Sequence, residues 1–472
     1  MSVVQRTLAF SFGTLLSRLT GLVRDTILAS VFGASTLLDA YYVAIIFPFF
    51  LRRTFAEGAM TSAFLPLYNN LETEEEKQAF VSAVLTSLGL VTLSITVFVE
   101  IFPSVIPAIF STGASGETKL LATRLIRITA PFVVLEFVWA LFYALHNSQH
   151  RYFLPAMTPL FSNVGVMVGA LTGSVVLATW GFTLGNLVAV LVLLPRNFRY
   201  RPTLKGLGNF YKMFLVTSLT MATSQVTTLV DTNVASFLGE GSLSLVQLAG
   251  RIYQLPLGIF GVAVSTVALS TLSQTDDYEK DLRDLFTKNF FFTLPASLGL
   301  FLLSRELITL FFGYGAFGTR AVEEASKVLA MYAPGLLFVS VFNLLSRARH
   351  AALDTKTPFV AMLIVSVSNA ILDVVLGFTL GASGIALATT LSSILGTTYL
   401  ILRHGFKPDW RAIIKIAIAS GVMGVFTYSF KLLFRGRIWT VTNVALSVAL
   451  FLIVGKILKI EEVRELKSTL LR

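Results

Sequence analysis

The stretch DTILASVFG, at residues 25–33, returns as DTNVASFLG at residues 231–239, and this pair decides the fold. Both copies begin with Asp-Thr, keep Ala-Ser in the middle and end in Gly, at an offset of 206 residues. Three further markers return in the same order: Ala-Pro at 130–131 and 333–334, Pro at 155 and 358, and Ser-Asn at 162–163 and 368–369. The sequence therefore predicts two related halves.

Composition indicates what the halves are made of. The 472 residues are 55% hydrophobic and 13% charged, with a mean hydropathy of +0.77. A soluble chain of this composition would expose far too much apolar surface, so we expect a multi-pass membrane protein. The chain has no cysteine, which excludes disulfides and thiolate-ligated metals, and its four histidines show no metal-ligand spacing.

The apolar runs predict about fourteen membrane-spanning helices. The expected segments are 7–32, 36–68, 79–110, 119–147, 153–178, 181–196, 209–238, 243–273, 283–312, 321–348, 357–380, 383–402, 411–433 and 438–458. Six segments separate each repeated motif from its copy, and an even number preserves direction across the membrane. We predict an all-α protein with two six-helix bundles related by a pseudo-two-fold axis along the membrane normal, plus two C-terminal helices.

This organisation divides the chain into three parts. The expected boundaries are 1–200 for an N-terminal lobe, 201–408 for a C-terminal lobe, and 409–472 for the added helices and a cytoplasmic tail. Most lysines and arginines of the connections fall on one side if the N-terminus is inside, so both termini are expected in the cytoplasm. The net charge of +11 is then largely an orientation signal with some attraction to anionic membrane lipids, and nucleic-acid binding is not indicated.

Four arginines lie inside long apolar segments, where each opposes insertion by roughly 2.5–3.5 kcal/mol. They are Arg18, Arg24, Arg52 and Arg251. Guanidinium groups from several helices suit an anion with many oxygens, such as a diphosphate. The alternative is that each arginine pairs with Asp25, Asp39 or Glu57 and only fixes helix packing. We interpret these acids as supports for the arginines, with Asp39 a candidate for movement during gating, and expect Arg53 and Glu57 to neutralise each other at i, i+4.

The second half offers a candidate cation site. Under the 206-residue offset Arg18, Arg24 and Arg52 match uncharged residues, whereas Asp25 matches Asp231. Asp231 is expected to face no basic residue of its own repeat unit, Asn369 and Asp373 share a helical face at i, i+4, and Thr389 on the next helix could join these two carboxylates and the amide. These oxygens would suit Na⁺ or carry a proton, and interhelical hydrogen bonding is the alternative.

Three stretches resemble the MurJ (MviN) family of lipid II flippases, within the multidrug/oligosaccharidyl-lipid/polysaccharide exporter superfamily. They are SRLTGLVRDTILASVFGAS (17–35), the LLDAYYVA that follows, and LRRTFAEGAMTSAFLPLY (51–68). The resemblance covers essentially the whole chain. It implies a bacterial inner-membrane protein that moves lipid II, the undecaprenyl-diphosphate-linked peptidoglycan precursor, to the outer leaflet, in support of cell-wall biogenesis and cell shape.

The resemblance also implies roles for individual residues. The family's cavity arginines map onto Arg18, Arg24, Arg52 and Arg251, and its acid in helix two onto Asp39; Ser17 begins the first matching stretch and is a supporting candidate. Helices thirteen and fourteen would line a groove for the lipid tail. The segment GRIYQLP around Arg251 departs from the family, because many relatives carry an acid beside this arginine.

Transport without a chemical step is the reading that the residues favour. We find no GxxxxGK[ST] loop and expect no ATP use and no cofactor apart from a possible Na⁺ ion. We expect a monomer that rocks between inward and outward states, driven by membrane potential or an ion gradient. An exporter of another lipid-linked oligosaccharide or a cation-coupled drug exporter is the alternative. A membrane-embedded enzyme would need a nucleophile, base or metal triad beside the arginines, whereas the available acids are better ion-pair partners.

Overall fold

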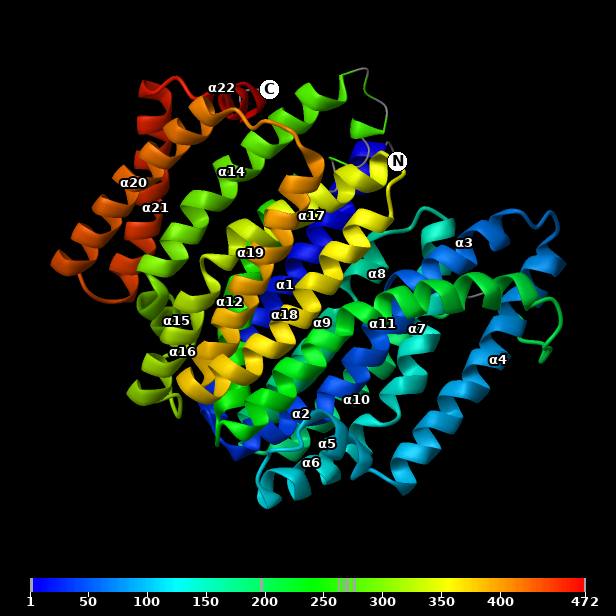
Figure 1. The fold of residues 1–472 in the computed structure, drawn as a ribbon. Helices are drawn as coiled ribbons and strands as arrows, with labels where there is room; N and C mark the ends of the chain where they lie inside the picture. The colour runs from blue at the N-terminus through cyan, green and yellow to red at the C-terminus, as the bar shows by residue number, and fades with distance from the viewer. Residues whose placement is uncertain are drawn as a thin grey trace. The chain divides into compact units, whose positions relative to one another are not determined.

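The computed structural model describes residues 3–195, 198–261 and 277–470, together with positions 264–265, 268, 271–273 and 275. Every regular element within these residues is a helix, as Figure 1 shows. The all-α fold predicted from the apolar runs is therefore confirmed. The chain forms two compact units, which are described separately.

Unit 1 comprises Met1–Ser244 and the short segment Tyr314–Phe317. Its helices are α1 (Val3–Phe32), α2 (Thr36–Leu51), the π-helix η1 (Arg52–Met60), α3 (Thr61–Asn69), α4 (Glu74–Ile101), α5 (Val105–Phe110), α6 (Gly116–Thr129), α7 (Phe132–Ser148), α8 (Phe153–Met157), α9 (Pro159–Leu171), α10 (Val175–Leu193) and α11 (Gly208–Phe237). The apolar core of this unit joins α3, α4, α7, α10 and α11.

Unit 2 comprises Leu245–Gly313 and Gly318–Arg472. Its helices are α12 (Ser242–Pro256), whose first turn belongs to unit 1, the π-helix η2 (Leu257–Gly261), α14 (Tyr278–Leu302), α15 (Ser304–Phe311), α16 (Thr319–Tyr332), α17 (Gly335–Ala351), α18 (Lys356–Leu380), α19 (Ala382–His404), α20 (Trp410–Leu433), α21 (Arg437–Ile457) and α22 (Glu461–Leu470). The added helices α20 and α21 pack on α14 through an apolar cluster that includes Phe291, Met423 and Phe451.

The compact units divide the chain at a different place from the repeat. The repeat predicts a boundary near residue 200, whereas α11, the first helix of the second copy, packs against η1 and α3 in unit 1. Compactness and internal symmetry are different criteria, so the repeat-based lobes and their two-fold relation stay a prediction.

Nine of the described helices are long and apolar enough to cross a membrane, and the pair α6 and α7, bent by 43°, makes a tenth. Four stretches expected to span fall outside this set: α1, α2 to α3, α11, and α12 to η2. These four stretches carry the candidate arginines and Asp231, and two of them are divided into shorter α-helices by the π-helices η1 and η2. The count of fourteen is consistent with this pattern.

The repeat is visible in equivalent hydrogen bonds inside each unit. Thr183 Oγ1 donates to the carbonyl of Ile128, and Thr390 Oγ1 donates to that of Met331, both at 2.7 Å. The Ala130 carbonyl, where α6 bends into α7, accepts from Thr96, and the Ala333 carbonyl, between α16 and α17, accepts from Ser297. In each copy, therefore, a hydroxyl from a neighbouring helix donates to the alanine carbonyl of the Ala-Pro pair.

Several predicted boundaries differ from the structure, and the break between α9 and α10 shows why. The segment expected at 153–178 ends at Leu171, and the next helix begins at Val175. Gly173 has a φ of +79°, which favours glycine, and the Ser174 hydroxyl caps α10 by accepting from the Leu177 amide. This turn lies within an apolar run, so hydropathy alone placed the break too late.

Candidate anion-binding site

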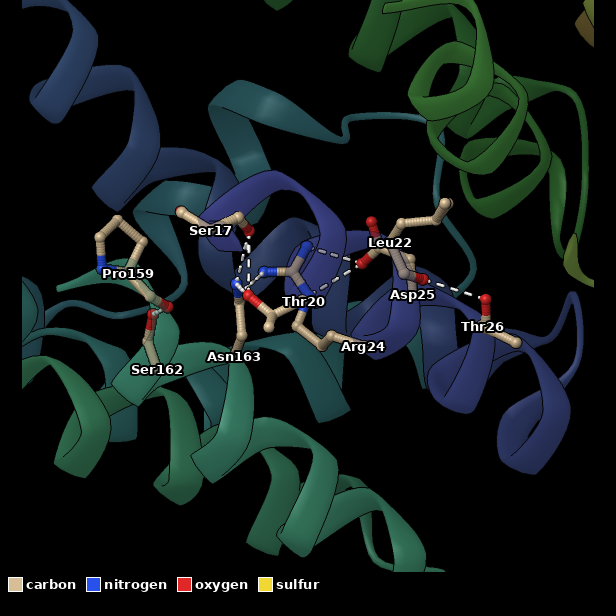
Figure 2. Close-up of polar contacts among 9 residues, drawn as sticks. All are labelled: Ser17, Thr20, Leu22, Arg24, Asp25, Thr26, Pro159, Ser162 and Asn163. Carbon is tan, nitrogen blue, oxygen red and sulfur yellow. Dashed lines mark hydrogen bonds and ion pairs between the residues drawn. The ribbon is translucent and has the colours of Figure 1, made fainter. Parts of the chain in front are cut away.

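Arg24 occupies a buried position on α1 with its side chain held from two sides. The residue is 6% exposed. Its Nε and Nη2 donate to Asp25 Oδ1 at 2.9 and 2.6 Å, and its Nη1 donates to Asn163 Oδ1 on α9 at 3.1 Å (Figure 2). The interpretation of Asp25 as a support for Arg24 agrees with this geometry. An arginine fixed at both ends of its guanidinium is preorganised, because its rotamers are already restricted.

Asn163 connects this arginine to the preceding turn of α1. Its Nδ2 donates to the Ser17 carbonyl at 3.2 Å and to Thr20 Oγ1 at 3.0 Å, as Figure 2 also shows. Ser17, a supporting candidate, thus contributes its backbone. The side-chain amide of Asn163 thus accepts through its oxygen and donates through its nitrogen. These bonds fix both the distance between α1 and α9 and the direction of the Arg24 guanidinium.

Arg52 begins the π-helix η1, four residues after Pro48 inside α2. Its Nε lies 3.3 Å from Glu136 Oε1 on α7, and its guanidinium lies over the Trp139 ring, 4.8 Å from the centroid. Its side chain is 16% exposed and that of Glu136 is 4% exposed. The pair combines a semi-buried charge with a cation–π contact, and π-turns of this kind are frequent at functional sites.

The remaining basic candidates have different surroundings. Arg18 on α1 and Arg53 on η1 are exposed, and Arg251 on α12 is half-buried in unit 2. The Glu57 side chain lies outside the described residues, so its expected pair with Arg53 stays a prediction. Convergence of the four arginines on one cavity also stays a prediction, because Arg251 belongs to a different unit.

Asp39, in the first turn of α2, binds the start of α12. Its carboxylate accepts hydrogen bonds from the Gly241 amide at 2.7 Å, the Ser244 amide at 2.8 Å and the Ser244 hydroxyl. The residue is 6% exposed. In the opposite direction, Glu240 accepts from the Thr36 amide at 3.0 Å, which holds the pKa of Glu240 below its usual range. Each carboxylate therefore caps a helix of the other repeat copy.

Two further contacts bring second-copy segments onto the same region of unit 1. Asn233 Oδ1 on α11 accepts from the amide and hydroxyl of Thr112, and the Ser236 hydroxyl accepts from the Gly113 amide. The Ala316 amide donates to the Ser30 carbonyl at 2.7 Å. We call this set of contacts the outer clasp, because the charge pattern predicts that this end of the helices faces outward.

The candidate cation residues are partly brought together. In unit 2, Asn369 Nδ2 donates to Asp373 Oδ2 at 2.6 Å, and Ser392 Oγ donates to Asn369 Oδ1 at 3.1 Å. Thr389 instead bonds to the Ile385 carbonyl of its own helix. Asp231 is half-buried in unit 1, and within the described residues no cluster of three acidic or histidine side chains suits a metal ion.

Sequence reasoning missed three residues of these networks. Asn163 was not expected to be a partner of Arg24, Glu136 was overlooked, and Ser392 replaces Thr389 one turn further along α19. A signal for Glu136 was present, because it is a lone acid within the apolar run FVVLEFVWALF (132–142). The identity of its partner required the fold.

Apolar helices long enough to cross a membrane, with the guanidiniums of Arg24 and Arg52 held in ion pairs among them, are typical of one class of protein, the multi-pass membrane transporters. The family model described as lipid II flippase MurJ matches residues 28–459. A probable lipid II flippase MurJ of Thermotoga maritima is 59% identical over 469 residues, covering 99% of each chain. The chain therefore belongs to the lipid II flippase MurJ family.

Solved structures agree with this assignment. The structure described as "Lipid II flippase MurJ, inward closed conformation" matches with a TM-score of 0.89 and 38% identity, covering 95% of this chain and 98% of that one. An inward-facing multidrug resistance MATE family transporter of the MOP superfamily matches with a TM-score of 0.68 at 14% identity, covering 85% of this chain and 95% of that one. The second likeness concerns the fold alone.

Proposed function

We propose that the protein moves lipid II from the inner to the outer leaflet of the bacterial cytoplasmic membrane, with Arg24 and Arg52 lining the headgroup path. The observation that carries this is the guanidinium of Arg24, 6% exposed and oriented by Asp25 and Asn163. A site that served packing alone would gain little from an arginine, since hydrophobic residues replace buried ion pairs without loss of stability in many proteins. An oriented guanidinium is suited to a diphosphate.

The tail and the headgroup of the lipid cross the membrane in different surroundings, because their solvation differs. The polyprenyl tail is soluble in hydrocarbon, whereas a diphosphate moved through it without compensation would cost tens of kcal/mol in the Born limit. A polar path lined by fixed guanidiniums replaces the lost water contacts. The protein thus supplies a path and no bond is made or broken, so neither ATP nor a catalytic base is required.

The outer clasp suits a state closed on the outside. Asp39 and Glu240 hold helix starts from opposite repeat copies together through hydrogen bonds that can form or break as a set. Opening would release the amides of Gly241 and Ser244 to water. We propose that this exchange is the outer gate of an alternating-access cycle, with both termini in the cytoplasm and one chain as the working unit.

For the ion, we propose that Asn369 and Asp373 contribute oxygens to a Na⁺ site in unit 2, at which Thr389 or Ser392 adds a hydroxyl; a contribution from Asp231, which belongs to unit 1, stays a prediction. The described geometry fits in part: the carboxylate and amide are in contact, and the amide nitrogen is the end that faces Asp373. Na⁺ would need the amide oxygen there instead. Raising NaCl against KCl should stabilise wild type to heat and leave Asp373→Ala unchanged; identical melting in both salts would overturn the proposal.

The transport proposal is tested by complementation. In cells depleted of their own flippase, Arg24→Ala should lower lipid II in the outer leaflet at least tenfold, because an interaction with the diphosphate is removed. Arg124→Ala is the matched control, since Arg124 is an exposed arginine on α6. Protein level and thermal unfolding are measured for both variants. Normal outer-leaflet lipid II with Arg24→Ala would remove the central claim, and chemically altered lipid would favour the enzyme alternative.

A further inference from the structure

A cavity of about 1000 Å³ lies in unit 2 between α15 and the turn that joins α20 to α21. Its lining carries four basic side chains, Arg305, Lys431, Arg435 and Arg437, and one acidic side chain, Glu306. The headgroup path proposed above concerns Arg24 and Arg52 in unit 1 and does not include this cavity. Its charge is suited to an anion, and its volume exceeds what one phosphate fills.

Two of the basic groups are fixed by the fold. Lys431 Nζ donates to the Leu302 carbonyl at 2.6 Å and lies 3.8 Å from Glu306 Oε1, and the Arg437 guanidinium donates to the Gly313 carbonyl. These bonds attach the α20–α21 turn to the ends of α14 and α15. They hold the cations at the cavity without neutralising them all, since a carbonyl carries no full charge.

Arg435 differs from these groups. It lies in the turn between α20 and α21, next to Gly436, whose φ of +114° favours glycine. The Arg435 side chain is exposed and lines the cavity. It can therefore reach a ligand without first breaking a bond that supports the fold.

The rim of the cavity is apolar and exposed. Leu432, Phe434, Ile438 and Trp439 are 55%, 41%, 80% and 43% exposed, and the Phe434 and Trp439 rings lie 4.7 Å apart. Tryptophan and arginine side by side at a helix end are typical of the membrane interface, where the ring meets acyl chains and the cation meets phosphate. A soluble anion would gain nothing from this rim, whereas a lipid uses both parts.

We propose that this cavity is a binding site for an anionic phospholipid, whose phosphate contacts Arg435 and Arg437 and whose acyl chains lie against Trp439 and Ile438. Each basic residue near a membrane surface favours anionic lipid by roughly fivefold, so two arginines give a preference of about five- to twenty-five-fold over a zwitterionic lipid. Bound lipid would connect α15 with the α20–α21 turn.

Trp439 provides the measurement. The protein is reconstituted in vesicles that contain either brominated phosphatidylglycerol or brominated phosphatidylcholine, and bromine quenches a tryptophan that it touches. The difference in quenching between wild type and Trp439→Phe isolates this residue from the other tryptophans of the chain. We expect half-maximal quenching at a five- to twenty-five-fold lower fraction of phosphatidylglycerol than of phosphatidylcholine.

Charge variants decide the cause of the preference. Arg435→Gln should lower the preference about fivefold, Arg435→Lys should retain it, and Arg320→Gln, an exposed arginine on α16 outside the cavity lining, should leave it unchanged. Equal quenching by both lipids in wild type would overturn the proposal. Loss of the preference on adding millimolar inorganic phosphate at constant ionic strength would also overturn it, because the cavity would then bind a soluble anion. Displacement of the brominated lipid by lipid II alone would overturn it too, because the cavity would then be a substrate site.

Discussion

Replacing Asp39 by Asn should open the outer clasp. The carboxylate accepts three hydrogen bonds, from the Gly241 and Ser244 amides and the Ser244 hydroxyl, in a place that is 6% exposed. A hydrogen bond to a charged group contributes about 1.5–3 kcal/mol. Asparagine removes the charge and directs amide hydrogens at backbone donors, so at least one bond is lost and the others weaken. We expect the closed arrangement to lose about 3 kcal/mol, a factor of roughly one hundred in population.

A single cysteine can measure this change, since the chain has none of its own. Ala235 on α11 is 0% exposed and lies between Asn233 and Ser236, which contact the 109–113 segment. A thiol placed there by Ala235→Cys reacts with a water-soluble maleimide only when the clasp opens. Its labelling rate is proportional to the open population, so Asp39→Asn should raise the rate by up to a hundredfold.

Glu240→Gln is the matched control. It changes a carboxylate of the same clasp that makes one exposed hydrogen bond, to the Thr36 amide, and exposed charge pairs contribute less than about 1 kcal/mol. The labelling rate should then rise no more than about fivefold. Equal rates for Asp39→Asn and wild type, or equal rates for the two variants, would refute the reasoning that Asp39 holds the outer end closed.

Two further changes test the same region. Gly315 has a φ of +54°, and a β-carbon there would lie 2.2 Å from the Ser30 carbonyl oxygen. Gly315→Ala should therefore lower the free energy of unfolding by about 2 kcal/mol or more. Gly299→Ala, in open space on α14, is the control and should not lower it; equal melting curves for the two variants would contradict this. Because the Thr36 amide lowers the pKa of Glu240, its contribution is complete above the ordinary glutamate pKa of about 4.3 and is lost as pH falls through the lower folded value. Hydrogen exchange at Thr36 should therefore accelerate, relative to its intrinsic rate, in acid alone, and Glu240→Gln should abolish that acid-dependent step.

The sequence allowed most of the fold to be predicted, because apolar runs and the repeat are local or periodic signals. The helix from 208 to 237 and the four helices from α18 to α21 lie within one or two residues of the predicted segments, whereas α22 falls in the stretch predicted as a tail. The π-helices were missed. Hydropathy is an average over a window of residues and does not depend on which carbonyl accepts from which amide. A change from i→i+4 to i→i+5 hydrogen bonding therefore does not alter it.

The candidate site was predictable where partners are neighbours in sequence. Asp25 lies beside Arg24, and the pairing was among the alternatives considered. Asn163 lies 139 positions from Arg24, and Glu136 lies 84 positions from Arg52. Which residues become the partners of these arginines therefore depends on how α9 and α7 pack, and the sequence does not show that packing. Ser392 and Thr389 share one face of α19, and the prediction chose the right face but the wrong turn.

The two π-helices also carry information about the history of the chain. A π-turn arises when one residue is inserted into an α-helix, and η1 and η2 begin at Arg52 and Leu257, within one residue of the 206-residue offset between the copies. Two independent insertions at one place are less economical than a single event. An insertion already present in the ancestral half when its gene duplicated is the simplest account of both π-helices, and it would place the arginine at the start of η1 in one descendant only.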